Sequence, residues 1–174
     1  IYLMEDNCES MGAKIKKKYS GTFGIVNTFS TFFSHHISTI EGGLILTDDF
    51  EVYNLLLSLR SHGWTRDLSK NFYLKKDQNK YENYCFTIPG YNVRPTNLNA
   101  AIGIEQLKKL KNLIDIRRKN YKFFNKIFKN DDRFIFQKFN KEHSCFAFTL
   151  ILKPKYKHLK NKIFESLRKN KIEF

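Results

Sequence analysis

Short apolar runs that end in polar residues dominate the first fifty positions of the chain. Residues 1–4 are continuously apolar and are followed at once by acid, with Asp6 as the second acidic residue. This pattern is typical of a parallel strand buried on both faces. Residues 25–30 and 42–47 predict two more strands, and the polar, glycine-punctuated stretch 12–24 predicts a hairpin or loop. The pattern therefore predicts an α/β sheet with Asp6 at its carboxyl edge, where ligands bind in open sheets.

The spacing of apolar residues changes to a helical period after the third strand. Asp48 or Asp49 is placed to cap a helix that continues through Ser61. Residues 65–83 are polar with few apolar anchors, which predicts a long mobile loop.

The second half of the chain is predicted to be mainly helical. A helix capped by Thr96 should continue through Leu110, and a long, basic, amphipathic helix should follow it. A strand is predicted over residues 146–152 and a last helix over residues 156–169.

Composition changes near residues 129–132, which predicts a boundary there. Residues 1–128 are expected to form part of a large domain with the helices that follow it, and residues 129–174 part of a small C-terminal α+β domain. Both ends of the chain resemble strands, so we expect an internal piece of a longer protein. No apolar run is long enough to span a bilayer and no signal peptide is visible, so a cytoplasmic location without a membrane partner is expected.

The formal net charge of +14 raises the possibility of a nucleic-acid partner. The lysines are spread over many segments, however, and no helix-turn-helix, RRM or zinc-finger signature accompanies them. Abundant Lys, Asn, Ile and Phe are typical of A/T-rich codon usage, so we expect no nucleic-acid partner. The three cysteines are widely spaced without a CxxC pair, which favours small buried side chains over a metal site or a disulfide framework.

The candidate chemistry lies in residues 29–43, which read FSTFFSHHISTIEGG. His35 and His36 stand between an apolar strand and two glycines, and Ser30 precedes His35 by five positions. Together with the strand that ends at Asp6, this segment resembles the cofactor pocket of the DegT/DnrJ/StrS-type sugar aminotransferases. Those proteins are fold-type I enzymes that depend on pyridoxal phosphate. The resemblance implies an α/β, fold-type I aminotransferase-like fold, with part of a large domain built on a mostly parallel sheet.

The resemblance also implies which residues carry the chemistry. In most of the family a lysine occupies the position of His35 and holds the cofactor as a Schiff base. Histidine cannot form that bond, but it can take up and deliver protons near neutral pH. The resemblance implies that Asp6 is the partner of the cofactor ring nitrogen and that Glu9 contacts the ring. It implies that Ser30 binds the cofactor phosphate and that Asn92 binds the cofactor phosphate of a second copy. Because Asn92 would reach across a dimer interface, residues 90–94 should be exposed and unsupported in a single copy.

Histidine at this position marks a branch of the family that removes a hydroxyl from a sugar. The resemblance therefore implies 3-dehydration of a nucleotide-linked 4-keto-6-deoxyhexose for polysaccharide or lipopolysaccharide biosynthesis. It implies pyridoxal or pyridoxamine phosphate as cofactor, glutamate as amino donor and a homodimer. The alternatives are a sugar aminotransferase and a non-catalytic interaction protein on the same fold. For individual residues, Asp6 could be a plain strand-end acid, Glu9 a solvated turn residue and Ser30 a structural strand end.

Overall fold

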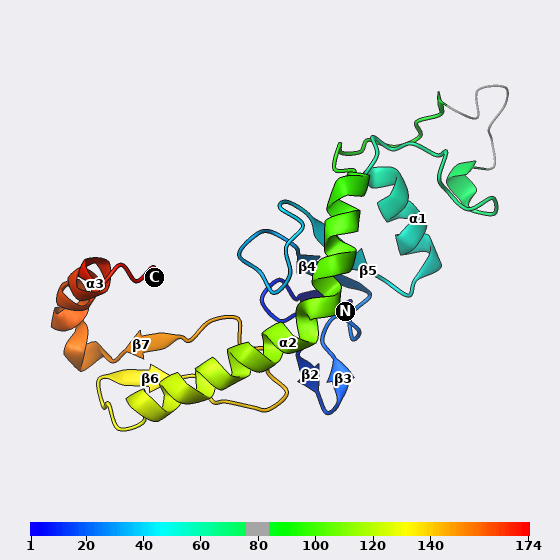
Figure 1. Cartoon of the computed structure of the whole chain (residues 1–174). Coiled ribbons are helices and arrows are strands. Elements are labelled where there is room, and N and C mark those ends of the chain that lie inside the picture. The colour runs from blue at the N-terminus through cyan, green and yellow to red at the C-terminus, as the bar shows by residue number, and fades with distance from the viewer. Residues whose placement is uncertain (76–83) are drawn as a thin grey trace.

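The computed structural model describes residues 1–75 and 84–174. A three-stranded sheet, in the order β1 (Met4–Asp6), β4 (Val26–Ser30) and β5 (Gly43–Leu46), lies near its centre (Figure 1). β1 pairs with β4 in parallel, and β4 pairs with β5 antiparallel. The three strands predicted within the first fifty residues are all present, and one of the two pairings in this sheet is parallel.

The expected burial of residues 1–4 is wrong. The strand begins only at Met4, and Ile1, Tyr2 and Met4 are all exposed. β1 is the edge strand of the three-stranded sheet, and within it only the central residue Glu5 is half-buried. Burial is instead concentrated on the inner strand β4, where alternate side chains such as Phe29 turn inward.

The core of this region is small and is closed by the long helix. Met11, Phe29 and Ile37 are buried together, and Leu110 of the helix packs against them. Between β1 and β4 the chain forms the predicted hairpin, from β2 (Lys14–Ile15) and β3 (Lys18–Tyr19). The carboxylate of Glu142 accepts hydrogen bonds from the backbone N–H groups of the two turn residues at 3.1 and 2.8 Å, so the hairpin is tied to the C-terminal part of the chain.

Helix α1 (Phe50–Leu59) follows β5 and is capped as predicted. The Asp49 carboxylate accepts a hydrogen bond from the backbone N–H of Val52 at 2.9 Å. The helix ends two residues before the predicted residue 61, and Gly63 lies in the left-handed region at φ 83°.

The expectation of few apolar anchors after α1 is wrong for residues 65–75. Leu68 and Phe72 are both buried, and residues Tyr73–Lys75 form a short 3-10 helix. The buried side chain of Asn54 on α1 accepts a hydrogen bond from the backbone N–H of Ser69 at 2.8 Å, which fixes the loop against the helix. The rest of the predicted loop, 76–83, lies outside the described residues.

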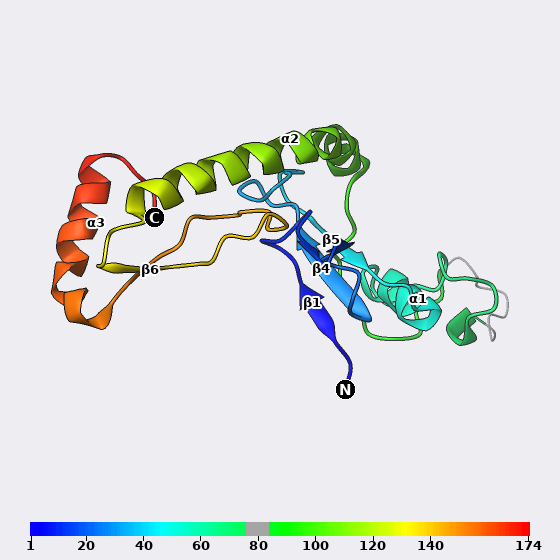
Figure 2. The ribbon, with the colours of Figure 1, turned by 90° about the horizontal axis from the view of Figure 1, so that it is seen from below.

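Helix α2 (Asn97–Phe128) is one continuous helix where the sequence predicted two. Thr96 caps it as predicted, by accepting a hydrogen bond from the backbone N–H of Asn99 at 3.3 Å. No proline interrupts the helix, and its apolar residues keep their helical spacing through the predicted boundary. Its first half lies beside the sheet and its second half beside the C-terminal hairpin (Figures 1 and 2).

The C-terminal part consists of a hairpin and a helix. β6 (Phe134–Phe136) pairs antiparallel with β7 (Leu150–Leu152), and a 3-10 helix (Pro154–Leu159) leads into α3 (Lys160–Lys169). The predicted strand 146–152 is therefore reduced to its last three residues, because the backbone before it bonds to α2 instead. β6 was not predicted at all.

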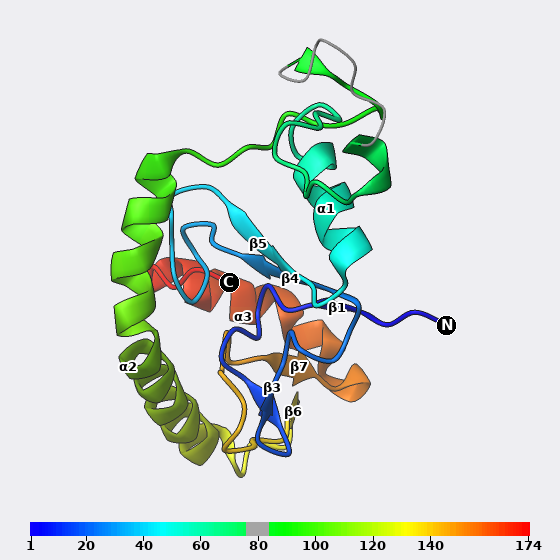
Figure 3. The ribbon, with the colours of Figure 1, turned by 90° about the vertical axis from the view of Figure 1, so that its right-hand side faces the viewer.

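Aromatic rings join the hairpin to α2. Phe148 lies within 5.1 to 5.8 Å, centroid to centroid, of the rings of Tyr121, Phe124 and Phe128 on the helix. Figure 3 shows the sheet between α1 on one side and this C-terminal part on the other. Among the described residues, no helix is long and apolar enough to cross a lipid bilayer. The division of the chain near residue 129 stays a prediction.

Candidate functional site

The carboxyl ends of β1 and β4 meet at one edge of the sheet. Asp6, the last residue of β1, pairs in register with Thr28, and the two side chains approach to 3.4 Å. Side chains two positions apart in a strand point to the same face, so Ser30 lies on the face that carries Asp6 and Thr28. The sheet therefore brings Asp6 and Ser30 together at the edge where the sequence predicted a ligand.

Asp6 is an exposed carboxylate that favours its charged form. The thiol of Cys8 and its backbone N–H, 3.2 Å away, both donate hydrogen bonds to Asp6 and lower the pKa of that carboxyl. The same contact raises the pKa of the Cys8 thiol. Asp6 is therefore ionised at neutral pH and able to stabilise a positive charge placed beside it.

Glu5, the neighbouring acid, has a structural role instead. Its carboxylate accepts hydrogen bonds from the backbone N–H groups of Gly21, Phe23 and Gly24 at 2.8, 2.6 and 2.8 Å. Burial alone would raise the pKa of Glu5, but these three bonds lower it. Glu5 thus closes the loop that leads into β4 and leaves Asp6 as the free acid of the pair.

His35 lies in the loop after β4, in a mainly aromatic surrounding. Its Nε2 atom is 3.7 Å from a carboxylate oxygen of Glu9, which links this loop to the end of β1. The rings of Phe32 and Phe146 lie 6.1 and 5.3 Å from the imidazole, centroid to centroid, and the side chain is only 14% exposed. The second ring nitrogen, Nδ1, is buried and has no hydrogen-bond partner among the described residues. His35 is therefore held at the sheet edge with one nitrogen near an acid and one unpaired.

Ser30 keeps a free donor at the same edge. Its Oγ atom accepts a hydrogen bond from the backbone N–H of Phe32 at 3.2 Å, which fixes the turn out of β4. Among the described residues, no acceptor takes the hydrogen of its hydroxyl. A hydroxyl positioned in this way suits an anionic oxygen of a ligand.

His36 differs completely from its neighbour. Its side chain is 2% exposed, and its Nε2 atom lies 3.3 Å from the backbone carbonyl of Ser144. Burial lowers the pKa of His36 to about 4, against a smaller opposing effect of the Ser144 carbonyl, while the positive charge of Arg117 lowers it further. The ring is thus neutral at pH 7 and donates from Nε2. His36 connects the candidate site to the C-terminal part of the chain.

Asn92 lies apart from the other predicted site residues. Residues 90–94 are exposed, as expected, but they are not unsupported. Three backbone hydrogen bonds of 2.6 to 3.0 Å join residues 91 and 93 to residues 59, 60 and 62 at the end of α1. Within the described residues, no hydrogen bond or ion pair joins Asn92 to Asp6, Glu9, Ser30 or His35.

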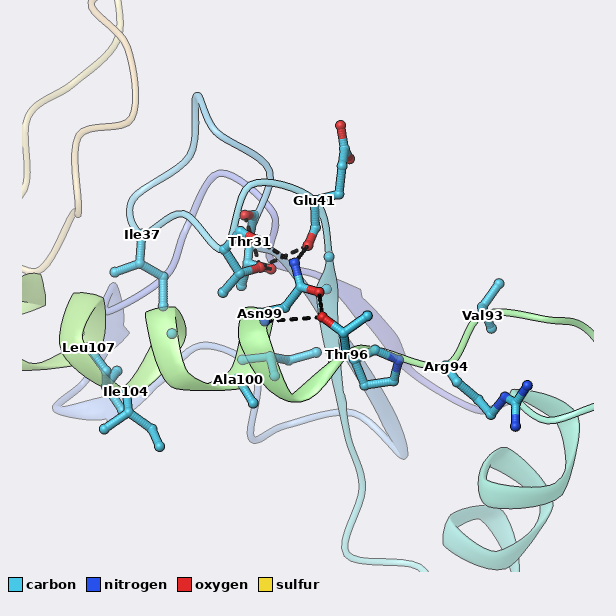
Figure 4. Close-up of a pocket in the computed structure, with 16 residues that line it drawn as sticks. Thr31, Ile37, Glu41, Val93, Arg94, Thr96, Asn99, Ala100, Ile104 and Leu107 are labelled. Carbon is cyan, nitrogen blue, oxygen red and sulfur yellow. Dashed lines mark hydrogen bonds between the residues drawn. The ribbon is translucent and has the colours of Figure 1, made fainter.

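Sequence reasoning missed a cavity of about 560 Å³ between the loop before β5, residues 93–96 and the start of α2 (Figure 4). Asn99 lies in its wall and donates hydrogen bonds to the backbone carbonyls of Thr39 and Glu41 at 2.6 and 3.2 Å. Six residues of the segment 29–43 line this cavity, among them Thr31 and Glu41, but none of the five predicted site residues does. The described part of the chain also has no cluster of three or more histidine, cysteine and acidic residues that could hold a metal ion.

Comparison with known proteins identifies the family of the chain. The sequence profile of the DegT/DnrJ/EryC1/StrS aminotransferase family matches residues 1–174. The chain belongs to this family. Its fold is accordingly the α/β, fold-type I aminotransferase-like one that the sequence predicted.

Two curated relatives of this family member are dehydratases. The chain is 48% identical over 176 residues to the GDP-4-keto-6-deoxy-D-mannose 3-dehydratase of Escherichia coli O55:H7 (strain CB9615 / EPEC), across 99% of this chain and 45% of the relative. It is 49% identical over 156 residues to the enzyme of the same name from Yersinia pseudotuberculosis, across 88% of this chain and 40% of the relative. The chain thus spans less than half of the length of these relatives.

Solved structures of 3-dehydratases match nearly the whole chain, and one of them is from E. coli. The form with bound hydrated PLP matches with a TM-score of 0.91 at 47% identity, across 99% of this chain and 45% of that one. Further structures of GDP-4-keto-6-deoxymannose-3-dehydratase match with the same TM-score. One, a histidine-to-asparagine variant, holds GDP-perosamine, and another holds a trapped PLP–glutamate geminal diamine. A third replaces a histidine by lysine and the serine before it by asparagine.

Proposed function

We propose that the protein to which this chain belongs is a nucleotide-sugar 3-dehydratase that uses pyridoxal or pyridoxamine phosphate. Its substrate is a GDP-linked 4-keto-6-deoxyhexose, as the names of the E. coli and Yersinia relatives indicate. The observation that carries the proposal is the placement of His35 beside Glu9 at the sheet edge, at a position where the resemblance implies a lysine in most of the family. Its ring is held at the sheet edge against Glu9 and is ready to exchange protons.

The residues at this edge fit the cofactor. The ionised Asp6 carboxylate would keep a pyridine nitrogen protonated, and the Ser30 hydroxyl would donate to a phosphate oxygen. The unpaired Nδ1 of His35 is a buried polar atom of the kind that a bound ligand satisfies. When bound, the cofactor supplies the electron sink that permits loss of the C3 hydroxyl.

His35 moves the protons in this proposal. It first acts as a base and then, in its protonated form, donates that proton to the departing hydroxyl, which leaves as water. Glu9 lies close enough to orient the ring. His36 is unsuited to the task because its Nε2 atom is engaged by Ser144 and its pKa of about 4 keeps it unprotonated at neutral pH.

The remaining parts of the proposal concern partners. Glutamate is the amino donor that restores the amine form of the cofactor, a role supported by the PLP–glutamate adduct in a structure of GDP-4-keto-6-deoxymannose-3-dehydratase. A second copy of the chain completes the site, with Asn92 on the exposed segment 90–94 directed to the partner's phosphate site. Residues 1–128 and 129–174 would then belong to a large and a small domain.

The second candidate is a sugar aminotransferase, because the family also includes enzymes such as the GDP-perosamine synthase of Escherichia coli O157:H7. Residues 29–43 contain no lysine, so this segment offers no amine to hold the cofactor covalently. Solved variants of GDP-4-keto-6-deoxymannose-3-dehydratase exchange a histidine and, in one case, the serine before it. A serine–histidine pair stands here at Ser34 and His35, and a second at Ser61 and His62, outside the candidate site.

Substitution of His35 tests the proposal. In the full-length protein, His35→Asn should lower the dehydration rate at least a hundredfold, the lower range for acid–base groups, while the affinity for the cofactor stays near wild type. His158→Asn, at an exposed histidine of the C-terminal 3-10 helix, is the control and should keep its rate. Near-normal dehydration by His35→Asn would place the base elsewhere and refute the assignment.

A further inference from the structure

Phe146 connects the C-terminal part of the chain to the candidate site. Its ring centroid lies 5.3 Å from that of His35 and 5.8 Å from that of His36, with interplanar angles of 39° and 45°. Phe146 is 111 positions from His35 in the sequence, so only the tertiary fold brings these rings together. It forms one wall of the His35 surrounding, and Phe32 forms another.

The backbone on both sides of Phe146 is held by α2. Arg117 donates a hydrogen bond from Nη1 to the Phe146 carbonyl at 2.7 Å, and Arg118 donates from Nε to the His143 carbonyl at 2.8 Å. Both are charge-assisted bonds from a half-buried helix surface, which are stronger than bonds between neutral groups. The segment therefore takes its position from the helix, and this explains why residues 146–149 do not continue the β6–β7 ladder.

The loop that carries the histidines holds the same segment from the other side. The buried His36 donates to the Ser144 carbonyl at 3.3 Å, two residues before Phe146. Cys145, which stands between Ser144 and Phe146, is buried and adopts a left-handed backbone conformation with φ 56°. This conformation is strained for a residue with a side chain. The fold thus accepts backbone strain at the point that directs Phe146 toward His35.

We propose that Phe146 is a positioning residue for His35, a role that rests on the dehydratase function proposed above. The phenyl ring restricts the imidazole to the orientation in which Nε2 lies near Glu9, and it excludes water from that side of the ring. A misplacement of about 1 Å in a catalytic group can lower a rate about a hundredfold. Loss of the Phe146 ring should therefore lower the turnover rate through His35, whereas ligand binding should stay nearly unchanged. Arg117, Arg118 and His36 hold Phe146 in place.

The test compares Phe146→Leu with Phe148→Leu in the full-length holoenzyme. Phe148 is two residues away and similarly half-buried, and among the described residues its ring packs against aromatic rings of α2 and β6. Phe146→Leu should lower kcat about 10- to 100-fold with little change in KM for the sugar or in cofactor affinity. Phe148→Leu should keep its kcat, and Phe146→Tyr, which retains the ring, should recover most of the lost rate.

A second readout does not depend on turnover. Diethyl pyrocarbonate modification, located by tandem mass spectrometry, should be faster at His35 in Phe146→Leu than in wild type, and unchanged in Phe148→Leu. Equal effects of the two leucine variants on kcat, or unchanged modification of His35 in Phe146→Leu, would overturn the proposal. If the wild-type protein does not dehydrate its sugar, the proposed function fails, but the modification rates still decide whether Phe146 shields His35.

Discussion

Protonation of the buried His36 should couple the stability of the protein to pH. In the folded state burial lowers the pKa of His36 to about 4, whereas an unfolded histidine has a pKa near 6.5. Below pH 6.5 the unfolded state therefore binds a proton that the folded state does not. The stabilisation from the neutral ring is complete above about pH 6.5 and is lost progressively as the pH falls toward 4.

The size of this effect follows from the two pKa values. A depression to about 4 corresponds to about 3 kcal/mol between the limits of high and low pH. About 2 kcal/mol of that amount should already be lost at pH 5. His36 is 2% exposed, so little screening by solvent reduces the figure.

Urea unfolding at pH 7 and pH 5 measures the effect when wild type is compared with His36→Gln. Glutamine can still donate to the Ser144 carbonyl but does not titrate, so the comparison removes the contributions of Asp6, Glu5 and other acids. The free energy of unfolding of wild type should fall by about 2 kcal/mol more than that of the variant. Equal pH dependence of the two proteins would refute the reasoning. If His36→Gln does not fold, an NMR titration of wild type that shows His36 protonating near pH 6.5 would also refute it.

Three further substitutions test other parts of the structure. Tyr121→Phe removes the hydrogen bond that the buried tyrosine hydroxyl donates to the Gln137 carbonyl at 2.8 Å. The free energy of unfolding, measured in urea, should fall by about 1 kcal/mol. Tyr156→Phe removes a hydroxyl that bonds at an exposed site and should have a smaller effect. Gly63→Ala should lower the free energy of unfolding by about 2 kcal/mol or more in the same assay, because Gly63 has φ 83° and an added Cβ would clash with the Ile88 carbonyl oxygen. An unchanged urea midpoint would contradict the close approach of these two backbone segments. Asp6→Asn should weaken binding of pyridoxal phosphate at least tenfold in an absorbance titration, since a neutral amide does not stabilise a pyridinium, and unchanged affinity would remove Asp6 from the site.

The features that the sequence predicted correctly are mainly local. The caps at Asp49 and Thr96 depend on residues within three positions, and the β2–β3 hairpin depends on its own turn. The recognition of Asp6 and Ser30 as neighbours needed only the rule that parallel strands end at one edge. These relationships require no knowledge of how distant segments pack.

The features that the sequence did not reveal depend on distant contacts. β6 is only three residues long and exists because it pairs with β7, and Leu68 and Phe72 are buried only because Asn54 holds their loop against α1. The exposure of β1 reflects its place at the edge of the described sheet, which its apolar sequence does not indicate. The sequence predicted that Phe146 lies in a strand. That prediction is wrong because the Phe146 carbonyl bonds to Arg117 of α2, nearly thirty positions away, which local sequence cannot indicate.

The product formed by the full-length protein tests the central claim most directly. The purified protein would be incubated with GDP-4-keto-6-deoxymannose, pyridoxal phosphate and glutamate, and the sugar followed by proton NMR and mass spectrometry. A 3-dehydratase should yield a keto sugar with a methylene group at C3 and no added nitrogen, and the His35→Asn protein should leave the substrate unchanged. A product that retains the C3 hydroxyl and carries an amine at C4 would contradict the account and favour the aminotransferase.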